Sequence, residues 1–236
     1  MKKSVLEEIY RNIYNEMNKH YIVKGYRLDV IRGVRHLVKE DLMVFWGLHK
    51  EYPDTICVSP SLKVVNKEIK ITKDLLFPDS PNLTTYGLQH KDLVTLMDRQ
   101  YELPPNFRWY EVSLETNFEE VVADHMSFMQ AVGFDYLEQF STLDKIDKYF
   151  SSRILDFSIE DFAGNDYNTN MKLIAKLSGI REVRSGLIAA YLNNNPLLED
   201  LRHKYKEVYG ELKINNILDD ISIIENYFSD NPVKLT

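Results

Sequence analysis

Acidic side chains at helical spacing are the strongest candidates for chemistry in this sequence. The group within two helical turns consists of Glu119, Glu120, Asp124 and His125. Glu120 and Asp124, four residues apart, share a helix face, as carboxylate ligands of one divalent ion must. This spacing allows a metal-dependent phosphoester hydrolase that uses Glu119, Glu120 and Asp124, with arginines binding the phosphate. The helix macrodipole accounts for Glu119 and Glu120 equally well without a metal, because acidic residues favour a helix N-terminus.

The other histidines and the single cysteine are scattered along the chain. They are His20, His36, His49, His90, His203 and Cys57. None stands at the spacing of an H-E-x-x-H zinc helix or a Cys-x-x-Cys site, and the sequence has no glycine-rich phosphate loop and no G-x-S-x-G elbow. We therefore predict no catalytic residue, no cofactor and no metal site, with Glu120 and Asp124 as the one alternative.

A basic cluster near residue 30 is the predicted binding site. Arg27, Arg32 and Arg35 follow one another closely, and Trp46 lies in a nearby apolar segment. Aromatic side chains that interleave with cations suit an anionic ligand. Strand alternation would instead distribute the three arginines over different faces, with Trp46 as a core anchor.

Charge is unevenly distributed along the 236 residues, whose formal net charge is −7. Residues 1–50 hold ten Lys or Arg against six Asp or Glu, whereas residues 101–150 hold three against ten. The net negative charge argues against nucleic acid as the main ligand. The polarity suits the steering of another protein with an acidic surface toward the basic segment.

The sequence shows no sign of export or of membrane insertion. No segment approaches the roughly 18 uninterrupted apolar residues of a membrane helix. Glu7 and Glu8 interrupt what would be the apolar core of a signal peptide, and the single Cys57 cannot form an internal disulfide bridge. We expect a cytoplasmic protein that makes no contact with a membrane.

Hydrophobic periodicity predicts a helix over 4–20, followed by strands over 26–30, 34–38, 42–48, 55–58 and 62–65. Strand 42–48 is apolar on both faces and should be central. A hairpin loop over 39–41 would pair Val38 with Leu42 and His36 with Val44. We expect the turn residues Ser59-Pro60-Ser61 to separate the last two strands.

The second half of the sequence is predominantly helical. A short strand or helix is expected near 84–97 and a strand over 108–112. Thr116 and Glu119 form a capping-box pattern for a helix that Gly133 should end, and a second capping pattern begins at Ser141. Further helices are predicted over 168–178, 181–193, 196–209 and 214–228, with Gly179 and Gly210 as terminators.

These elements define an α+β fold: an antiparallel β-meander of about four to five strands packed by helices, followed by an all-helical C-terminal portion. We predict two parts, an α+β domain over 1–152 and a helical extension or small domain over 153–236.

Several local sequences together resemble an uncharacterised bacterial domain-of-unknown-function family with a helix, a β-meander and then helices. They are Lys-Gly-Tyr-Arg at 24–27, Val-Ser-Pro-Ser at 58–61 after a turn, and Trp-Tyr-Glu-Val-Ser at 109–113 leading into an acidic helix. The resemblance covers about residues 1–150. It implies an α+β fold and no established activity.

The favoured interpretation is a non-catalytic protein that binds another protein, such as an accessory, immunity-like protein of a bacterial cell. The alternative is the metal-dependent phosphoester hydrolase with Glu119, Glu120 and Asp124. The sequence does not specify the oligomeric state.

Overall fold

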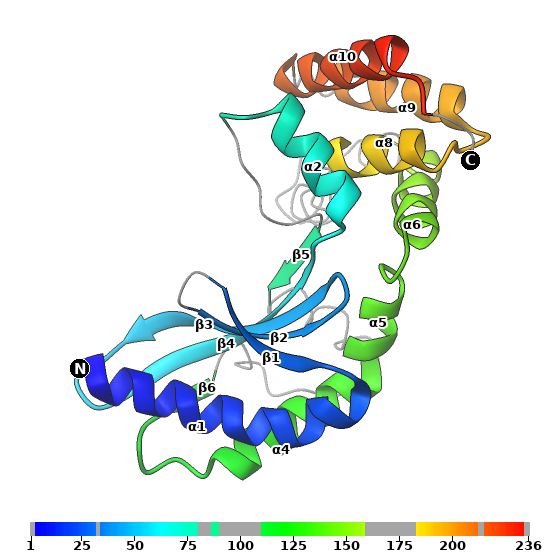
Figure 1. The fold of residues 1–236 in the computed structure, drawn as a ribbon. Coiled ribbons are helices and arrows are strands. Elements are labelled where there is room, and N and C mark those ends of the chain that lie inside the picture. The colour runs from blue at the N-terminus through cyan, green and yellow to red at the C-terminus, as the bar shows by residue number, and fades with distance from the viewer. Residues whose placement is uncertain are drawn as a thin grey trace. The chain divides into compact units, whose positions relative to one another are not determined.

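The computed structural model describes residues 3–31, 34–79, 86–89, 110–158, 183–211 and 215–233 (Figure 1). It divides into two compact units, each made of two stretches of chain: unit 1 is Met1–Val64 with Gly87–Glu138, and unit 2 is Val65–Tyr86 with Gln139–Thr236. The predicted α+β class is confirmed. The predicted division after residue 152 falls inside helix α6 (Leu143–Leu155).

The sheet of unit 1 begins with the predicted meander. Strands β1 (Arg27–Ile31), β2 (Val34–Lys39), β3 (Leu42–Glu51) and β4 (Ile56–Val64) pair in sequence order, each antiparallel to the next. Strand β5 (Tyr86–Gln89) follows β4 in the sheet, and β6 (Tyr110–Val112) also pairs with β4. Strand β3 is central, as its two apolar faces predicted, and among the described strands β1 lies at one edge of the sheet.

The predicted register of the β2–β3 hairpin is wrong by one residue. The loop contains only Glu40 and Asp41, so Lys39 lies opposite Leu42 and Leu37 opposite Val44, in place of His36. Glu40 adopts a left-handed conformation with φ 51°, which the two-residue turn requires. This register keeps Leu37 and Val44, both fully buried, on the same core face of the sheet.

The expected break at Ser59-Pro60-Ser61 is also wrong, because β4 runs through it without interruption. Pro60 lies opposite Trp46 and is buried. The Trp46 N–H points toward β2, away from β4, and donates to the Tyr14 hydroxyl. Trp46 and Pro60 therefore form a non-hydrogen-bonded pair of the β3–β4 ladder, so that the missing proline N–H costs no bond to β3.

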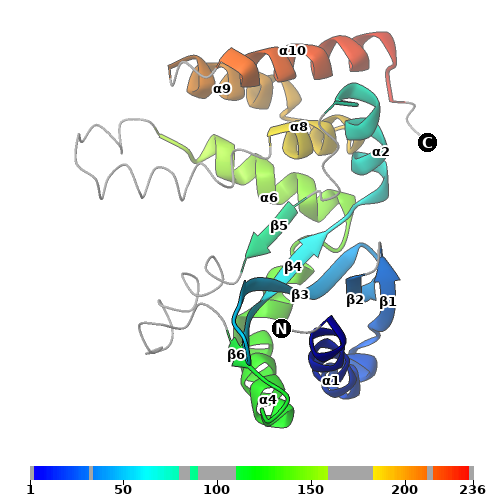
Figure 2. The same cartoon turned by 90° about the vertical axis from the view of Figure 1, so that its left-hand side faces the viewer.

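Helices α1 (Lys3–Tyr21) and α4 (Phe118–Phe128) lie on the same side of this sheet in both ribbon views (Figures 1 and 2). A short 3₁₀ turn, η1 (Ile22–Lys24), follows α1. The predicted apolar stripe of α1 is buried, namely Ile9, Ile13, Tyr14, Met17 and Tyr21. Packing of this stripe on the sheet makes the core of unit 1.

Two of the predicted helix signals in unit 1 do not act as expected. The residue before α4 is Asn117, and Thr116 does not cap the helix but accepts the Ser113 N–H at 2.8 Å. Gly133 does not end a helix, since the chain continues through a π-helical turn (Met129–Gly133) into α5 (Phe134–Glu138). A Cβ at Gly133 would lie 2.4 Å from the Met129 sulfur, so the glycine makes room for that side chain.

Unit 2 is helical in its described part (Figure 2). It contains α2 (Lys67–Leu76), α6, α8 (Val183–Leu192), α9 (Leu198–Glu211) and α10 (Asn215–Asp230). Helix α2 was not predicted; its N-cap is Asn66, whose side chain accepts the Ile69 N–H at 3.1 Å. The second capping pattern predicted the start of α6, but the cap is Thr142, whose side chain accepts the Lys145 N–H, and not Ser141.

The other sequence signals in this half have different outcomes. Gly210 lies within α9 instead of ending it. The helix predicted over 168–178 and its terminator Gly179 lie outside the described residues. No helix in the described ranges is both long and apolar enough to cross a membrane.

Helix α8 approaches its neighbours closely at Gly186. A Cβ there would lie 2.6 Å from the Tyr205 hydroxyl of α9 and 2.9 Å from the Phe150 Cβ of α6. Both distances are shorter than real Cβ contacts allow, so only glycine fits between these helices. Gly210 differs, because a Cβ there meets no atom within 4 Å.

We expect Gly186→Ala to destabilise the protein by about 1–3 kcal/mol, the typical cost of overpacking a close-packed interior. The matched control is Gly210→Ala, which should be neutral or stabilising by up to about 1 kcal/mol because alanine favours a helix. Urea unfolding followed by circular dichroism measures both. Equal effects of the two substitutions would contradict the close approach at Gly186.

Candidate functional site

A tyrosine hydroxyl from α1 lies between strands β2 and β3. The Tyr14 hydroxyl donates to the Arg35 carbonyl at 2.5 Å and accepts the Trp46 N–H at 2.9 Å. Leu37 pairs with Val44, and continuing this register by two residues away from the hairpin loop places Arg35 opposite Trp46. The hydroxyl thus replaces a direct strand-to-strand bond and joins the helix to the sheet. Burial raises the pKa of Tyr14 far above its usual value, so the hydroxyl keeps its proton.

The bond from the Tyr14 hydroxyl to the Arg35 carbonyl defines which backbone groups of β1 point away from β2. The Arg35 carbonyl points toward β3, so Arg35 and Val30 are a non-hydrogen-bonded pair of the β1–β2 ladder. The N–H and C=O groups of Val30 therefore point away from β2, and those of Leu28, two residues earlier, do the same. These are the groups that an edge strand offers to another strand.

The side chains of this edge alternate in character. Leu28 and Val30, on one face, are 39% and 60% exposed. Arg27 and Asp29 lie on the other face, with Arg27 exposed and Asp29 half-buried. The Asp29 carboxylate accepts the outward Val30 N–H at 2.7 Å. We refer to residues Arg27, Leu28, Asp29 and Val30 as the β1 edge.

More exposed aliphatic and basic residues precede the β1 edge in the chain. Ile22 and Val23 of η1 are 58% and 81% exposed. Lys24 is exposed too, with its ammonium group 4.6 Å from the centre of the Phe134 ring. Exposed aliphatic side chains that occur together are typical of surfaces that bind protein.

The predicted basic cluster is not gathered on one surface. Arg35 lies opposite Val30 and Arg27 opposite Val38, so the two arginines project from opposite faces of the sheet. Arg32 lies outside the described residues. Trp46 is 1% exposed and stacks on the Tyr110 ring at 5.0 Å. Of the four predicted binding residues, Arg27 is the one that the structure places exposed on the β1 edge.

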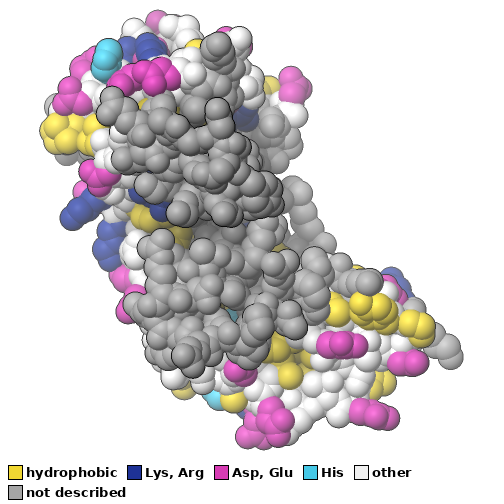
Figure 3. Space-filling model, turned by 180° about the vertical axis from the view of Figure 1, so that it is seen from behind, with side chains coloured by type: hydrophobic (Ala, Val, Ile, Leu, Met, Phe, Trp, Pro, Cys, Tyr) yellow, Lys and Arg dark blue, Asp and Glu magenta, His cyan; other side chains and the backbone are white. Residues whose placement is uncertain are grey.

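Two acidic residues of α4, Glu120 and Asp124, accept hydrogen bonds from other side chains of unit 1. The Glu120 carboxylate accepts from the Asn117 side chain, and the Asp124 carboxylate from the Tyr110 hydroxyl, both at 2.8 Å. In the part of the chain that the structure describes, no three His, Cys, Asp or Glu residues are grouped to hold a metal. Figure 3 shows acidic side chains at several places on the lower part of the face that it draws.

His125 points into the core of unit 1 and is fully buried. Its Nε2 lies 2.8 Å from the Tyr21 hydroxyl, and its ring stacks on that of Tyr21 at 6.0 Å and meets the Trp46 ring edge-on at 5.3 Å. Burial raises the pKa of Tyr21 well above its usual value. This packing makes His125 part of the core between α1, α4 and β3. Cys57 is buried as well.

The buried polar groups of unit 2 hold helices together. The Asp147 carboxylate of α6 accepts from the Ser151 hydroxyl at 2.7 Å and from the side-chain amides of Asn193 and Asn195 at 2.8 Å each. Asn194 takes the left-handed conformation that ends α8, and the Asn195 N–H bonds back to the Ala190 carbonyl. Asp147 thereby fixes the α8–α9 turn against α6.

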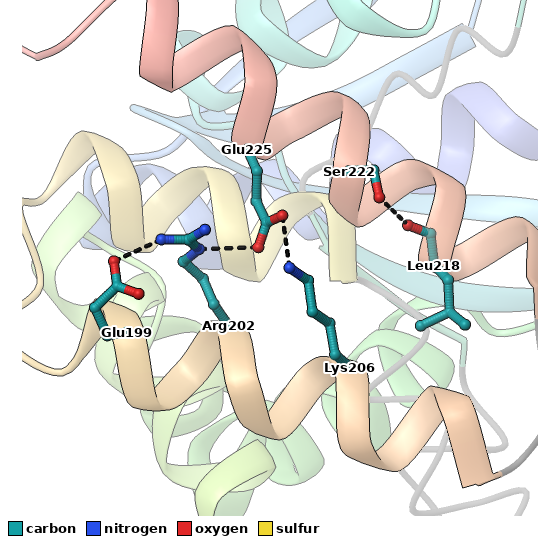
Figure 4. Close-up of polar contacts among 6 residues, drawn as sticks. All are labelled: Glu199, Arg202, Lys206, Leu218, Ser222 and Glu225. Carbon is teal, nitrogen blue, oxygen red and sulfur yellow. Dashed lines mark hydrogen bonds and ion pairs between the residues drawn. The ribbon is translucent and has the colours of Figure 1, made fainter.

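A charged network joins α9 to α10 (Figure 4). Glu225 accepts from Arg202 Nε at 2.9 Å and from Lys206 Nζ at 2.8 Å, and Arg202 also contacts Glu199. Partial burial acts to raise the pKa of the Glu225 carboxyl, but the bonds from Lys206 and Arg202 outweigh it and hold the pKa below its ordinary value of 4.5. The network is structural, since each charge lies beside an opposite one.

Comparisons of the chain with protein-family models, with curated proteins and with solved structures found no match. The resemblance to an uncharacterised bacterial family stays a prediction.

We expect Tyr14→Phe to cost about 1–3 kcal/mol, because it leaves a buried N–H and a C=O without their shared partner. Tyr10→Phe is the control, since Tyr10 lies one helical turn away on α1 and the structure gives its hydroxyl no hydrogen bond within the described ranges; its cost should stay below about 0.5 kcal/mol. Urea unfolding gives both values. Equal stability of Tyr14→Phe and the parent protein would show that the hydroxyl bridge is dispensable.

We expect Glu225→Gln to lower the melting temperature at neutral pH, because it removes the charge that Arg202 and Lys206 contact. A carboxyl whose pKa is lowered in the folded state stabilises the protein above its unfolded pKa, and this contribution is lost as the pH falls through the folded value. The difference in melting temperature should therefore vanish well below pH 4.5. Ser222→Ala, in the same helix but bonded to the uncharged Leu218 carbonyl, should show no such pH dependence.

Proposed function

We propose that this protein is a non-catalytic binding protein that takes an extended strand of another polypeptide along its β1 edge. The observation that carries the proposal is the outward-pointing backbone of Leu28 and Val30 together with their exposed aliphatic side chains. Main-chain bonds to a sheet edge supply affinity for an added strand, and alternate side chains supply specificity. The exposed cation predicted for this segment, Arg27, belongs to the same edge.

The charges of the edge define the partner strand. In an antiparallel pair, the residue opposite Asp29 lies two positions before the residue opposite Arg27. Opposite charges face each other when the added strand reads basic, apolar, acidic from its N-terminus, with the apolar residue beside Leu28. An acidic residue on the partner opposite Arg27 agrees with the expectation that the partner presents acidic groups.

The chemistry of the buried groups supports a binding role over catalysis. His125, Asp147 and Cys57 are buried, and the bonds described for His125 and Asp147 are contacts that hold the chain's own elements together. The proposal includes the sequence-based expectation of a cytoplasmic, immunity-like accessory protein of a bacterial cell.

The test uses two synthetic peptides of identical composition, one with Arg-Leu-Asp and the other with Asp-Leu-Arg at the centre of an alternating strand sequence. We expect the first to shift the amide resonances of residues 26–30 on titration and to bind about tenfold or more tightly than the second, because two cross-strand charge pairs change sign between them. Shifts confined to other parts of the protein, or equal binding of the two peptides, would refute the proposal.

A further inference from the structure

We propose that the strand that fits the β1 edge is the β1 edge of a second copy of this chain, an inference that rests on the proposed function. The required order of basic, apolar and acidic residues is the order that β1 itself presents, as Arg27, Leu28 and Asp29. Two copies can therefore pair antiparallel about a two-fold axis through Leu28. In that arrangement each Arg27 lies opposite the partner's Asp29.

The backbone of the edge allows this arrangement. Leu28 and Val30 carry the outward groups, so they must meet outward groups of the partner. A two-fold axis at Leu28 joins Leu28 to the partner's Leu28 by two N–H···O=C bonds and brings the Val30 N–H to the partner's Tyr26 carbonyl. The Tyr26 N–H is already bonded to the Tyr21 carbonyl at 3.1 Å, which leaves the Tyr26 carbonyl as the acceptor.

Charge excludes the neighbouring two-fold registers. An axis one residue earlier would place Arg27 opposite the partner's Arg27, and an axis one residue later would place Asp29 opposite the partner's Asp29. Like charges directly opposite each other destabilise a strand pair. The register centred on Leu28 makes two attractive pairs.

Asp29 has a different partner in the two states. In the single chain its carboxylate accepts the Val30 N–H at 2.7 Å and so occupies one of the outward donors. On pairing, the carboxylate turns to the partner's Arg27 and releases the Val30 N–H to the partner's Tyr26 carbonyl. The exchange leaves no donor of the edge without an acceptor.

The test is analytical ultracentrifugation of the full chain at concentrations up to about 1 mM, which detects weak dimers. We expect a concentration-dependent dimer. Arg27→Asp and Asp29→Arg should each weaken it about tenfold or more, since each change creates two like-charge pairs. The double variant Arg27→Asp with Asp29→Arg should restore the parent affinity, because the exchanged charges are again complementary.

Leu28→Lys is a further variant, which places two ammonium groups at the axis and should abolish the dimer; circular dichroism confirms the fold of each variant. Three outcomes would each overturn the inference. The parent protein could be monomeric at every concentration, the single charge reversals could leave the dimer intact, or the double exchange could fail to restore it. Binding of the Arg-Leu-Asp peptide by a monomeric parent protein would overturn self-pairing alone.

Discussion

The hydroxyl of Tyr14 is the constraint on which the arrangement of unit 1 depends. One oxygen satisfies a carbonyl of β2 and an N–H of β3, so that helix α1 is bonded to the sheet interior as well as packed on it. The direction of these two bonds defines which residues of β2 and β3 point their backbone groups toward each other, and the alternation continues in the neighbouring strands. Pro60 of β4 therefore faces Trp46 at a position where no hydrogen bond to β3 is lost, and the backbone groups of Leu28 and Val30 point away from β2.

Local patterns in the sequence predicted the first helix and the meander of unit 1 but not the register of its second hairpin or the continuity of β4. The four-residue spacing of Ile9, Ile13 and Met17 reports burial directly, and the helix and the central strand are where they were predicted. Only one face of strand 42–48 is buried, however: Leu42, Val44 and Trp46 are buried, whereas Met43 and Phe45 on the other face are half-buried. The hairpin register depends on whether Lys39 belongs to the loop or to the strand. A difference of one residue exchanges the two faces of a strand, which is why His36 was expected where Leu37 lies.

The glycine and proline signals failed because their meaning depends on tertiary contacts. Gly133 and Pro60 occupy places where space or a missing N–H matters, and nothing adjacent in sequence distinguishes such places from helix ends or turns. For the candidate site, Arg27 was predictable from charge. Leu28, Asp29 and Val30 were missed, although the first strand of a meander is commonly an edge strand, and their alternation was a usable signal.

The capped N–H of Val30 has a consequence for how the protein avoids aggregation. An edge strand with exposed aliphatic side chains invites indiscriminate strand addition, and natural proteins guard such strands with charge. Here Asp29 covers one outward donor with its own carboxylate, so an incoming strand must displace a charge-assisted bond before it can extend the sheet. An incoming strand that carries no cation leaves the displaced Asp29 carboxylate without a counter-charge. Addition of such strands is therefore disfavoured, and the sheet resists open-ended growth into fibres.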